Sequence, residues 1–260
     1  MKKILASIAF VSLSVSGCAT APASADSGPN DPFERFNRHV FEFNDTVDQA
    51  AIQPVARAYS NVFPSFVQTG VSNFFGNLGD VWTAANEFLQ GDFGAGLSDV
   101  MRVSLNSTFG IAGLLDIASA ASIPKHSEDF GKTLGVWGFP DGPYVVLPFL
   151  GPSTVRDAIG TPFDFYGDPF SYTKPVDVRN SGTVVRAVNK RAGLLDASSL
   201  LDDAALDKYI FVRDGYLQRR ASQVELRLED RQDKKDDAAA AAATAEAVKA
   251  VTESPEEDPR

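Results

Sequence analysis

Few side chains in this chain are suited to covalent chemistry. There are two histidines, His39 and His126, and they lie far apart in unrelated sequence contexts. A catalytic triad or a histidine-based zinc site needs several such groups together, so the sequence indicates neither. The Gly-x-Ser-x-Gly motif that positions the nucleophile of typical lipases does not occur. We therefore expect no catalytic residue, no metal and no cofactor, and we expect that the protein is not an enzyme.

The single cysteine, Cys18, is suited to a different reaction, namely acylation. Two lysines precede a short apolar run over residues 4–15, which is typical of a signal peptide and too short to span a bilayer. The run ends in Val15-Ser16-Gly17-Cys18, which resembles a bacterial lipobox. We predict a signal peptide over residues 1–17 and a lipidated Cys18. The alternative is an ordinary secretory peptide with an incidental cysteine. Ala19, rather than an aspartate, follows the cysteine, which favours export to the outer membrane.

Residues 130–157 combine the glycines and prolines of a loop with the large apolar side chains of a core. Proline removes a backbone donor and glycine loosens the backbone, so we expect neither a long helix nor a central strand here. Such a segment is either a buried Ω-like loop that closes the core or a segment that faces lipid, and the residues alone leave both open. Its large apolar residues are Val136, Trp137, Phe139, Tyr144, Val145, Val146, Leu147, Phe149 and Leu150.

The rest of the pattern predicts an all-α protein with a single compact helical domain over residues 31–230. Asp31, Pro32 and Glu34 suit the N-cap, N1 and N3 positions of a first helix. An apolar stripe follows at spacings of three and four residues, and Phe41 widens it. We expect this stripe to pack in the core. It consists of Phe33, Phe36, Val40, Phe43 and Val47.

Further helices are predicted along the domain, with no internal repeat and no run of period-two alternation. Asp80, Asp92 and either Ser153 or Thr154 are the expected caps. Residues 18–30, which follow the signal peptide, indicate a flexible tether. Residues 231–260 form an acidic, Ala-rich tail without a packing face, which we expect to be disordered or transiently helical. The expected helical segments cover residues 54–59, 64–79, 80–90, 92–105, 111–123, 153–159, 177–195 and 204–229.

Charge narrows the range of partners. The chain of 260 residues carries a formal net charge of −10. An acidic body lacks the basic footprint of a nucleic-acid-binding protein, so we expect no nucleic acid partner. The same charge argues against simple electrostatic attachment to anionic lipid. Attachment to a membrane should therefore be apolar.

A series of motifs occurs in order between residues 31 and 220. Together with the lipobox, this series resembles the MlaA (VacJ) family of outer-membrane lipoproteins. The motifs are Asp31-Pro32-x-Glu34-x-Phe36-Asn37-Arg38, Phe74 with Asn77-Leu78, Asn86-x-Phe88-Leu89-Gln90-Gly91, Asn106-Ser107-Thr108-x-Gly110, Phe130-Gly131-x-Thr133-Leu134-Gly135, Gly142-Pro143-Tyr144-Val145-x-Leu147-Pro148-Phe149, Arg156-Asp157, Leu194-Leu195-Asp196 and Tyr209-x-x-Val212-Arg213-x-x-Tyr216-x-x-Arg219.

The resemblance implies an architecture, a function and a set of partners. It implies a ring-like, all-helical body in the inner leaflet of the outer membrane, with a central amphipathic channel. It implies removal of mislocalised phospholipids from the outer leaflet and their transfer to a soluble periplasmic carrier that serves an ABC transporter. It also implies association with a trimeric porin. The expected location is the periplasmic side of the outer membrane, with a lipid anchor.

We hypothesise that the segment from Gly135 to Gly151 forms a mobile apolar gate or rim of this channel, because it mixes backbone breakers with large apolar residues. We further hypothesise that Phe41, Phe43 and Asn44 of the first helix keep the channel from leaking in the wrong direction. The candidate channel or gate residues are Phe41, Phe43, Asn44, Leu134, Val136, Trp137, Gly142, Pro143, Tyr144, Val145, Leu147, Pro148 and Phe149.

Two other classes of protein stay open. A structural or assembly lipoprotein would bind a barrel protein without moving lipid, and its core would be dry and uninterrupted. A lipid-hydrolysing enzyme would need an activated nucleophile, for which the sequence offers no recognised motif.

Overall fold

The computed structural model describes residues 31–252, and over this range the chain is mainly helical with one small sheet. The predicted all-α class is therefore confirmed, with a two-stranded hairpin added to it. The elements are α2 (Glu34–Val47), a π-helical turn (Asp48–Ile52), α3 (Gln53–Val62), α4 (Ser65–Gln90), α5 (Phe93–Phe109), α6 (Ile117–Ala120), α7 (Phe130–Val136), β1 (Tyr144–Leu147), β2 (Gly151–Thr154), α8 (Val155–Gly167), a 3₁₀ helix (Pro169–Tyr172), α9 (Val176–Ala192), α10 (Leu195–Ala204) and α11 (Lys208–Thr252).

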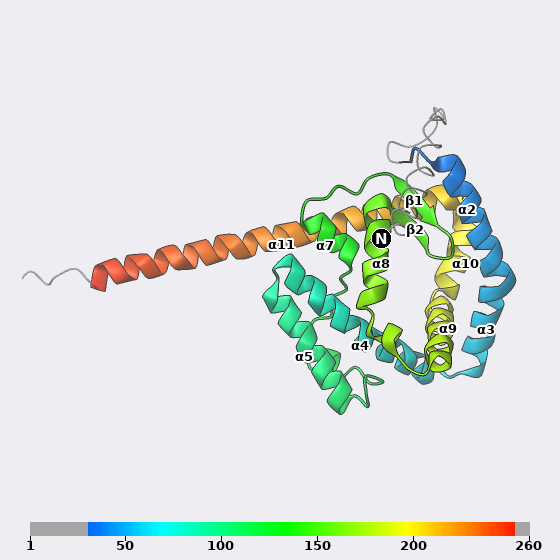
Figure 1. Cartoon of the computed structure of the whole chain (residues 1–260), viewed down its shortest axis with the longest axis horizontal. Helices are drawn as coiled ribbons and strands as arrows, with labels where there is room; N and C mark the ends of the chain where they lie inside the picture. The colour runs from blue at the N-terminus through cyan, green and yellow to red at the C-terminus, as the bar shows by residue number, and fades with distance from the viewer. Residues whose placement is uncertain (1–30, 253–260) are drawn as a thin grey trace, which may run out of the picture.

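The helices form a ring (Figure 1). One side is made by α2 and α3, with α9 packed against α3, and α4 runs from there along the base of the ring. The hairpin of β1 and β2 contacts both α2 and α8. The first half of α11 contacts α7 and β2, and its second half leaves the ring as a single helix. Segments distant in sequence thus close the ring together.

Local capping chemistry sets several helix starts. Asp92 accepts a hydrogen bond from the Ala95 amide and caps α5, as predicted. Thr154 accepts from the Asp157 amide and caps α8, which resolves the choice between Ser153 and Thr154. Asp80 does not begin a helix, because α4 continues through it as one helix of 26 residues. Its carboxylate is buried inside the ring instead, where it pairs with Lys125.

The predicted cap at Asp31 is wrong. Helix α2 begins at Glu34, and its N-cap residue, Phe33, makes no side-chain capping bond. The Asp31 carboxylate is buried and accepts hydrogen bonds from the Asn37 amide and the Tyr209 hydroxyl. A buried carboxylate needs such donors more than a solvated helix end needs a cap.

The predicted helix over residues 111–123 is also wrong. The chain turns after α5, with Ile111 and Ala112 in the left-handed region at φ of 53° and 56°, and only the four residues of α6 are helical. Gly110 explains the turn, since a Cβ there would lie 2.2 Å from the carbonyl oxygen of Leu115. The chain therefore folds back on itself at a position where other residues do not fit.

The Gly/Pro-rich segment contains no long helix, as predicted, but it does contain strands. Strands β1 and β2 pair antiparallel, with Tyr144 opposite Thr154 and Leu147 opposite Gly151. Proline is tolerated because the sheet has only two strands, so each strand has a free edge. Pro152 lies in β2, opposite Val146. The sequence pattern does not predict the hairpin, because β1 is a run of four apolar residues without alternation and β2 reads Gly-Pro-Ser-Thr.

The distribution of polar and apolar side chains is inverted relative to a water-soluble protein. Among the described residues, nineteen polar or charged residues are buried, against eight hydrophobic ones. Helix α5 shows the pattern most clearly: Asp99 and Arg102 are fully buried, whereas Phe93 and Leu97 are 65% and 62% exposed. The apolar stripe of α2, which we expected in the core, is likewise largely exposed at Phe36 and Phe43. That prediction fails because it assumed water outside and an apolar interior.

A small apolar core does exist where the hairpin meets the helices. Tyr144, Val146 and Tyr209 are buried together, and Val40 and Phe41 of α2 pack against them. One part of the predicted stripe is therefore in the core after all, namely Val40.

The C-terminal part of α11 extends past residue 230, where the predicted domain ends. The helix continues to Thr252, and its side chains described beyond residue 230 are exposed. We expected residues 231–260 to be disordered or transiently helical. Up to Thr252 they continue the helix that begins in the domain (Figure 1). Within residues 31–252, none of the helices combines the length and the apolar character needed to cross a bilayer.

Candidate functional site

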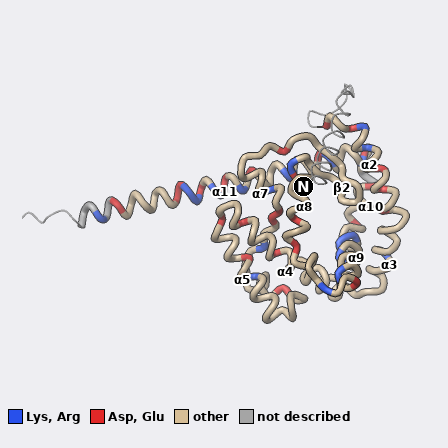
Figure 2. Tube along the Cα trace, viewed as in Figure 1, with Lys and Arg blue, Asp and Glu red and all other residues tan. Residues whose placement is uncertain are grey.

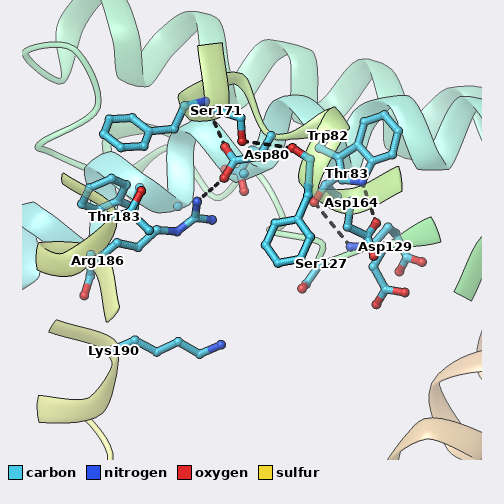
Figure 3. A pocket seen from close by; sticks show the side chains of 18 of the residues that line it. Asp80, Trp82, Thr83, Ser127, Asp129, Asp164, Ser171, Thr183, Arg186 and Lys190 are labelled. Carbon is cyan, nitrogen blue, oxygen red and sulfur yellow. Dashed lines mark hydrogen bonds and ion pairs between the residues drawn. The ribbon is translucent and has the colours of Figure 1, made fainter. Parts of the chain in front are cut away.

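The ring encloses a cavity of about 1010 Å³. Its lining comes from α4, the loop before α7, α8, the 3₁₀ helix and α9, so five segments position it (Figure 3). The lining is mixed, with aromatic rings such as Phe75 and Trp82 beside charged side chains. The volume lies at the upper end of the range of about 300–1,000 Å³ that is usual for small-molecule sites.

A basic wall of the cavity comes from α9. Arg179, Thr183, Arg186 and Lys190 all line it, and their spacing of four, three and four residues places them on one helix face. Arg186 pairs with Asp168 and lies over the ring of Phe75, 5.5 Å from its centroid. Lys190 extends into the open space (Figure 3), and Figure 2 shows the positive charges of α9 beside the opening. This wall can attract a phosphate group.

An acidic wall comes from α4, α8 and the loop before α7, at Asp80, Asp129 and Asp164 (Figure 3). Asp164 accepts hydrogen bonds of 2.8 Å from the Trp82 indole and from the Phe130 amide. Burial raises the pKa of both Asp80 and Asp164 above the ordinary aspartate value. The two walls together offer hydrogen-bond donors, acceptors and charge of both signs, which are the groups that a polar, charged head group requires.

The predicted gate residues do not line this cavity. The structure brings the residues of α2 together with the hairpin. Asn44 donates to the Leu147 carbonyl at 3.0 Å and accepts from the Phe149 amide at 2.8 Å, and the rings of Phe43 and Phe149 meet edge to face at 5.3 Å. The exposed tip of the hairpin, which includes Pro148 and Phe149, is thus fastened to α2.

The remaining candidates lie elsewhere. Leu134, Val136 and Trp137 belong to α7 or its end, where the Trp137 indole donates to the Leu89 carbonyl on α4 at 3.0 Å. Val136 is buried there. The other candidates belong to the hairpin or lead into it. Gly142 turns the chain at φ of 69°, Pro143 accepts from the Val155 amide, Tyr144 is buried and Val145 is half-buried. Cys18 lies outside the described residues.

Asn37 makes a contact with the hairpin that the sequence did not single out. Its side chain donates to the Tyr144 carbonyl at 3.0 Å and accepts from the Val146 amide at 2.9 Å, which repeats the pattern of Asn44 three residues earlier along the hairpin. Asn37 and Asn44 lie seven residues apart and therefore on the same face of α2. Their two amides take the place of a neighbouring strand along β1. We call Asn37 and Asn44 the asparagine clamp.

Replacing Asn37 with alanine is expected to lower the free energy of unfolding by roughly 2–3 kcal/mol, because the Tyr144 carbonyl and the Val146 amide would be left unpaired. Chemical denaturation in detergent measures the change. Asn73→Ala is the matched control, since Asn73 makes a single bond, to the Leu114 carbonyl. Equal effects of the two substitutions would show that the asparagine clamp does not hold the hairpin.

Helix α11 supplies another set of residues, of which the motif series quoted Tyr209, Arg213 and Tyr216 but not Arg220. Tyr209, Arg213, Tyr216 and Arg220 follow at spacings of four, three and four residues and face the ring. The resemblance pointed to Arg219, but Arg219 is exposed and its neighbour Arg220 is buried. The alternation of tyrosine and arginine on one helix face was the available signal.

A ring that exposes apolar side chains, buries polar ones and encloses a charged cavity defines a helical lipid-handling protein that operates in contact with a membrane. The chain belongs to the MlaA lipoprotein family, whose family model, described as "MlaA lipoprotein", matches residues 29–223.

Relatives of known name agree with this membership. The chain is 37% identical over 225 residues to the "Intermembrane phospholipid transport system lipoprotein MlaA" of Escherichia coli strain K12, covering 84% of this chain and 88% of that protein. It is 29% identical over 219 residues to the protein of the same name from Haemophilus influenzae, covering 79% and 84%. A solved structure reported as "Structural basis for maintenance of bacterial outer membrane lipid asymmetry" matches with a TM-score of 0.65 at 37% identity, covering 75% of this chain and 98% of that chain.

Proposed function

We propose that this protein removes mislocalised phospholipids from the outer leaflet of the outer membrane and passes them to a periplasmic carrier, which maintains the lipid asymmetry of that membrane. The observation that carries the proposal is the inverted distribution of polarity around a charged cavity. An exposed apolar surface fits a lipid surrounding, and an interior with both charges fits a phospholipid head group. The names of the relatives support the same function.

The physical need for such a path follows from the cost of wetting acyl chains. Two chains of sixteen carbons contain roughly thirty methylenes, and each costs about 0.8 kcal/mol to expose, so bare transfer to water costs on the order of 25 kcal/mol. A barrier of that size corresponds to about a day or more per event. A path that keeps the chains dry and the head group solvated removes most of this barrier without making or breaking a covalent bond.

We further propose that the segment from Gly135 to Gly151 acts as the gate of the lipid path, and the asparagine clamp supports this. Two side-chain amides hold β1 against α2, and the exposed tip of the hairpin presents Phe149 and Leu150. The base of the hairpin is held by the buried side chains of Tyr144 and Val146, whereas its exposed tip is held by the two hydrogen bonds of Asn44 and by the contact between Phe43 and Phe149. The tip can therefore detach at moderate cost, at roughly 0.5–1.5 kcal/mol for each net hydrogen bond. The gate then consists of the hairpin tip moving relative to α2, at the rim of the ring and outside the cavity itself.

We propose a lipid anchor at Cys18 on the periplasmic side of the outer membrane. Each buried methylene contributes roughly 0.8 kcal/mol to membrane binding, so two or three acyl chains would anchor the protein stably in the membrane. The exposed apolar residues of α5, among them Phe93 and Leu97, support additional contact with the lipid or with an apolar partner surface. A trimeric porin and the periplasmic carrier of an ABC transport system are the proposed protein partners.

The cavity weighs against the alternative of a purely structural assembly lipoprotein. Such a protein needs a complementary surface and gains nothing from charged walls around an interior space of about 1010 Å³. The hydrolase alternative would require release of fatty acid by the purified protein, and we expect none.

The proposal is tested by the phospholipid content of the outer leaflet in cells that lack the protein, measured with an acylating enzyme that acts only on that leaflet. We expect a rise that the wild-type protein reverses and a Cys18→Ala variant does not. The control is Ala19→Ser, which leaves the cysteine in place and should restore asymmetry. An unchanged outer leaflet in the deletion strain would contradict transport and favour the assembly role.

A further inference from the structure

Three side chains that could bind a metal ion converge beside the cavity. Glu87 comes from α4, Asp99 from α5 and His126 from the loop between α6 and α7. We infer that Glu87, Asp99 and His126 form a binding site for a divalent transition-metal ion, with Zn²⁺ as the best fit. The histidines had been set aside because they lie far apart in sequence, but here the other ligands are carboxylates.

The distances between the ligand atoms fit a small ion. Nδ1 of His126 lies 3.1 Å from Oδ2 of Asp99 and 3.3 Å from Oε1 of Glu87, and one ligand atom from each of the three residues lies within 4.8 Å of the others. Zinc binds nitrogen and carboxylate oxygen at about 2.0–2.2 Å in a tetrahedron, so two of its ligands lie roughly 3.3–3.5 Å apart. The two histidine–carboxylate distances are close to this value without rearrangement of the backbone.

A second observation points to a missing cation. Oε2 of Glu87 and Oδ1 of Asp99 have no hydrogen-bond donor among the described residues, although both side chains are fully buried. These are the second oxygens of the two carboxylates, since Oε1 of Glu87 and Oδ2 of Asp99 are the ones nearest Nδ1 of His126. Burying two incompletely satisfied carboxylates is costly, and a cation bound to both would reduce that cost.

The neighbouring arginine side chains compensate the two carboxylates only in part. Arg227 donates to Oε1 of Glu87 at 2.8 Å, but it is shared with Asp92 and Glu128. Nε of Arg102 lies 3.9 Å from Oδ1 of Asp99, beyond hydrogen-bond distance. The competing arrangement is the metal-free one, in which Nδ1 of His126 lies directly against both carboxylates.

An ion has a route to the site. His126 is partly exposed and lines both the large cavity and a second cavity of about 440 Å³ at the other side of the loop. The open side leaves room for a water molecule as the fourth ligand. One nitrogen and two oxygen ligands favour zinc over calcium, which takes six to eight oxygens.

The position of the site indicates what the ion would do. Ser127, Glu128 and Asp129 directly follow His126, and all three line the large cavity. A metal bound at His126 would fasten this wall of the cavity to the α4–α5 hairpin. The proposed role is structural and does not depend on transport.

The test uses the full chain without a polyhistidine tag, purified in detergent, stripped with a chelator and titrated with Zn²⁺, Ca²⁺ and Mg²⁺. We expect about one equivalent of Zn²⁺ to bind, with a higher melting temperature, and weak or no response to the other two ions. His126→Gln should weaken zinc binding by roughly tenfold or more. His39→Gln is the matched control, because His39 is the other histidine, lies exposed on α2 and should leave zinc binding unchanged.

Substitution of the buried carboxylates could unfold the chain, so the variant that decides the question is His126→Gln, in the loop. A visible spectrum of the Co²⁺-loaded protein adds a readout without any substitution, since a tetrahedral site gives intense absorption. Failure of the wild-type chain to bind zinc, or equal binding by His126→Gln, would overturn the proposal and leave His126 as an ion-pair partner of Asp99.

Discussion

Replacing Arg220 with methionine is expected to destabilise the protein by roughly 3 kcal/mol, because it removes the guanidinium that pairs with the buried Asp157 and the partly exposed Asp129. Arg156 remains beside Asp157 and keeps the loss at the lower end for a buried ion pair. Arg220 is 9% exposed and reaches Asp129 through bonds of 2.6 and 2.5 Å and Asp157 through one of 3.0 Å. Asp129 caps α7, and Asp157 lies in the first turn of α8. One guanidinium therefore joins α11 to two other helices. Chemical denaturation in detergent measures the loss.

Arg219→Met is the matched control for this experiment. Arg219 is the next residue along the same helix and is exposed, so its substitution should change the free energy of unfolding by less than about 0.5 kcal/mol. If Arg219→Met destabilised the protein as much as Arg220→Met, the loss would come from the helix and not from the buried ion pairs.

The pH dependence of the Arg220 effect gives a further check. Burial alone would raise the pKa of Asp129, but the hydrogen bonds and charge of Arg220 outweigh burial and hold this pKa below its ordinary value. A depressed pKa contributes stability above the unfolded-state pKa of about 4, and that stability is lost as the pH falls through the folded-state pKa. The difference between wild type and Arg220→Met should therefore be largest at neutral pH and narrow below about pH 4.

Fastening the hairpin tip to α2 is expected to abolish lipid removal while the fold stays intact. Phe43→Cys and Phe149→Cys provide the pair, since the two rings lie 5.3 Å apart and both side chains are exposed. Cys18 is the only natural cysteine, and in the proposed mature protein its sulfur carries lipid, so the engineered pair supplies the free thiols. A short, cleavable dithiol reagent joins the pair, and the outer-leaflet phospholipid content should then reach that of the deletion strain.

Several controls make the crosslinking result decisive. Each single cysteine variant treated with the reagent should retain transport, and cleavage of the reagent should restore transport in the double variant. The melting temperature of the crosslinked protein should not fall. Normal lipid asymmetry with the crosslink in place would contradict a moving gate, and the hairpin would then be a fixed rim of the ring.

The features of the fold that depend on residues close together in sequence could be predicted. The caps at Asp92 and Thr154 depend on one side chain and an amide three residues away, and both are confirmed. The helical class follows from spacing along single helices and is confirmed as well. Asp80 and Asp31 look like caps by the same local rule, but distant partners, Lys125 and Tyr209, decide their positions.

The inverted interior could not be predicted from periodicity, because a stripe of apolar residues shows that a helix has two faces but not which face points inward. The stripe on α2 and the stripe on α5 both face outward at most positions. The charged walls of the cavity were missed for a related reason. Arg186 and Lys190 look like solvated helix residues until α4 and α8 are known to face them.

The contacts of the predicted gate residues join parts of the chain that are distant in sequence, so the sequence could not show them. Asn44 and Phe149 are 105 positions apart, and the contact between them is a tertiary fact that only the folded chain shows. The grouping of Trp137 with the hairpin, by contrast, came from nearness in sequence, and the structure places Trp137 against α4 instead. Whether these residues gate the path is the question that the crosslinked pair addresses.

The continuation of α11 past residue 230 has a consequence for how helicity spreads along the chain. Starting a helix in water is unfavourable, because several residues must be ordered for the first hydrogen bond, whereas adding a residue to an existing helix is nearly neutral and favourable for alanine. Here the ion pairs of Arg220 and Arg227 already fix the first half of α11 against the ring. The Ala-rich segment therefore needs no packing face to be helical, since the folded domain serves as its nucleus, and its helical order should decrease gradually from residue 231 towards Thr252.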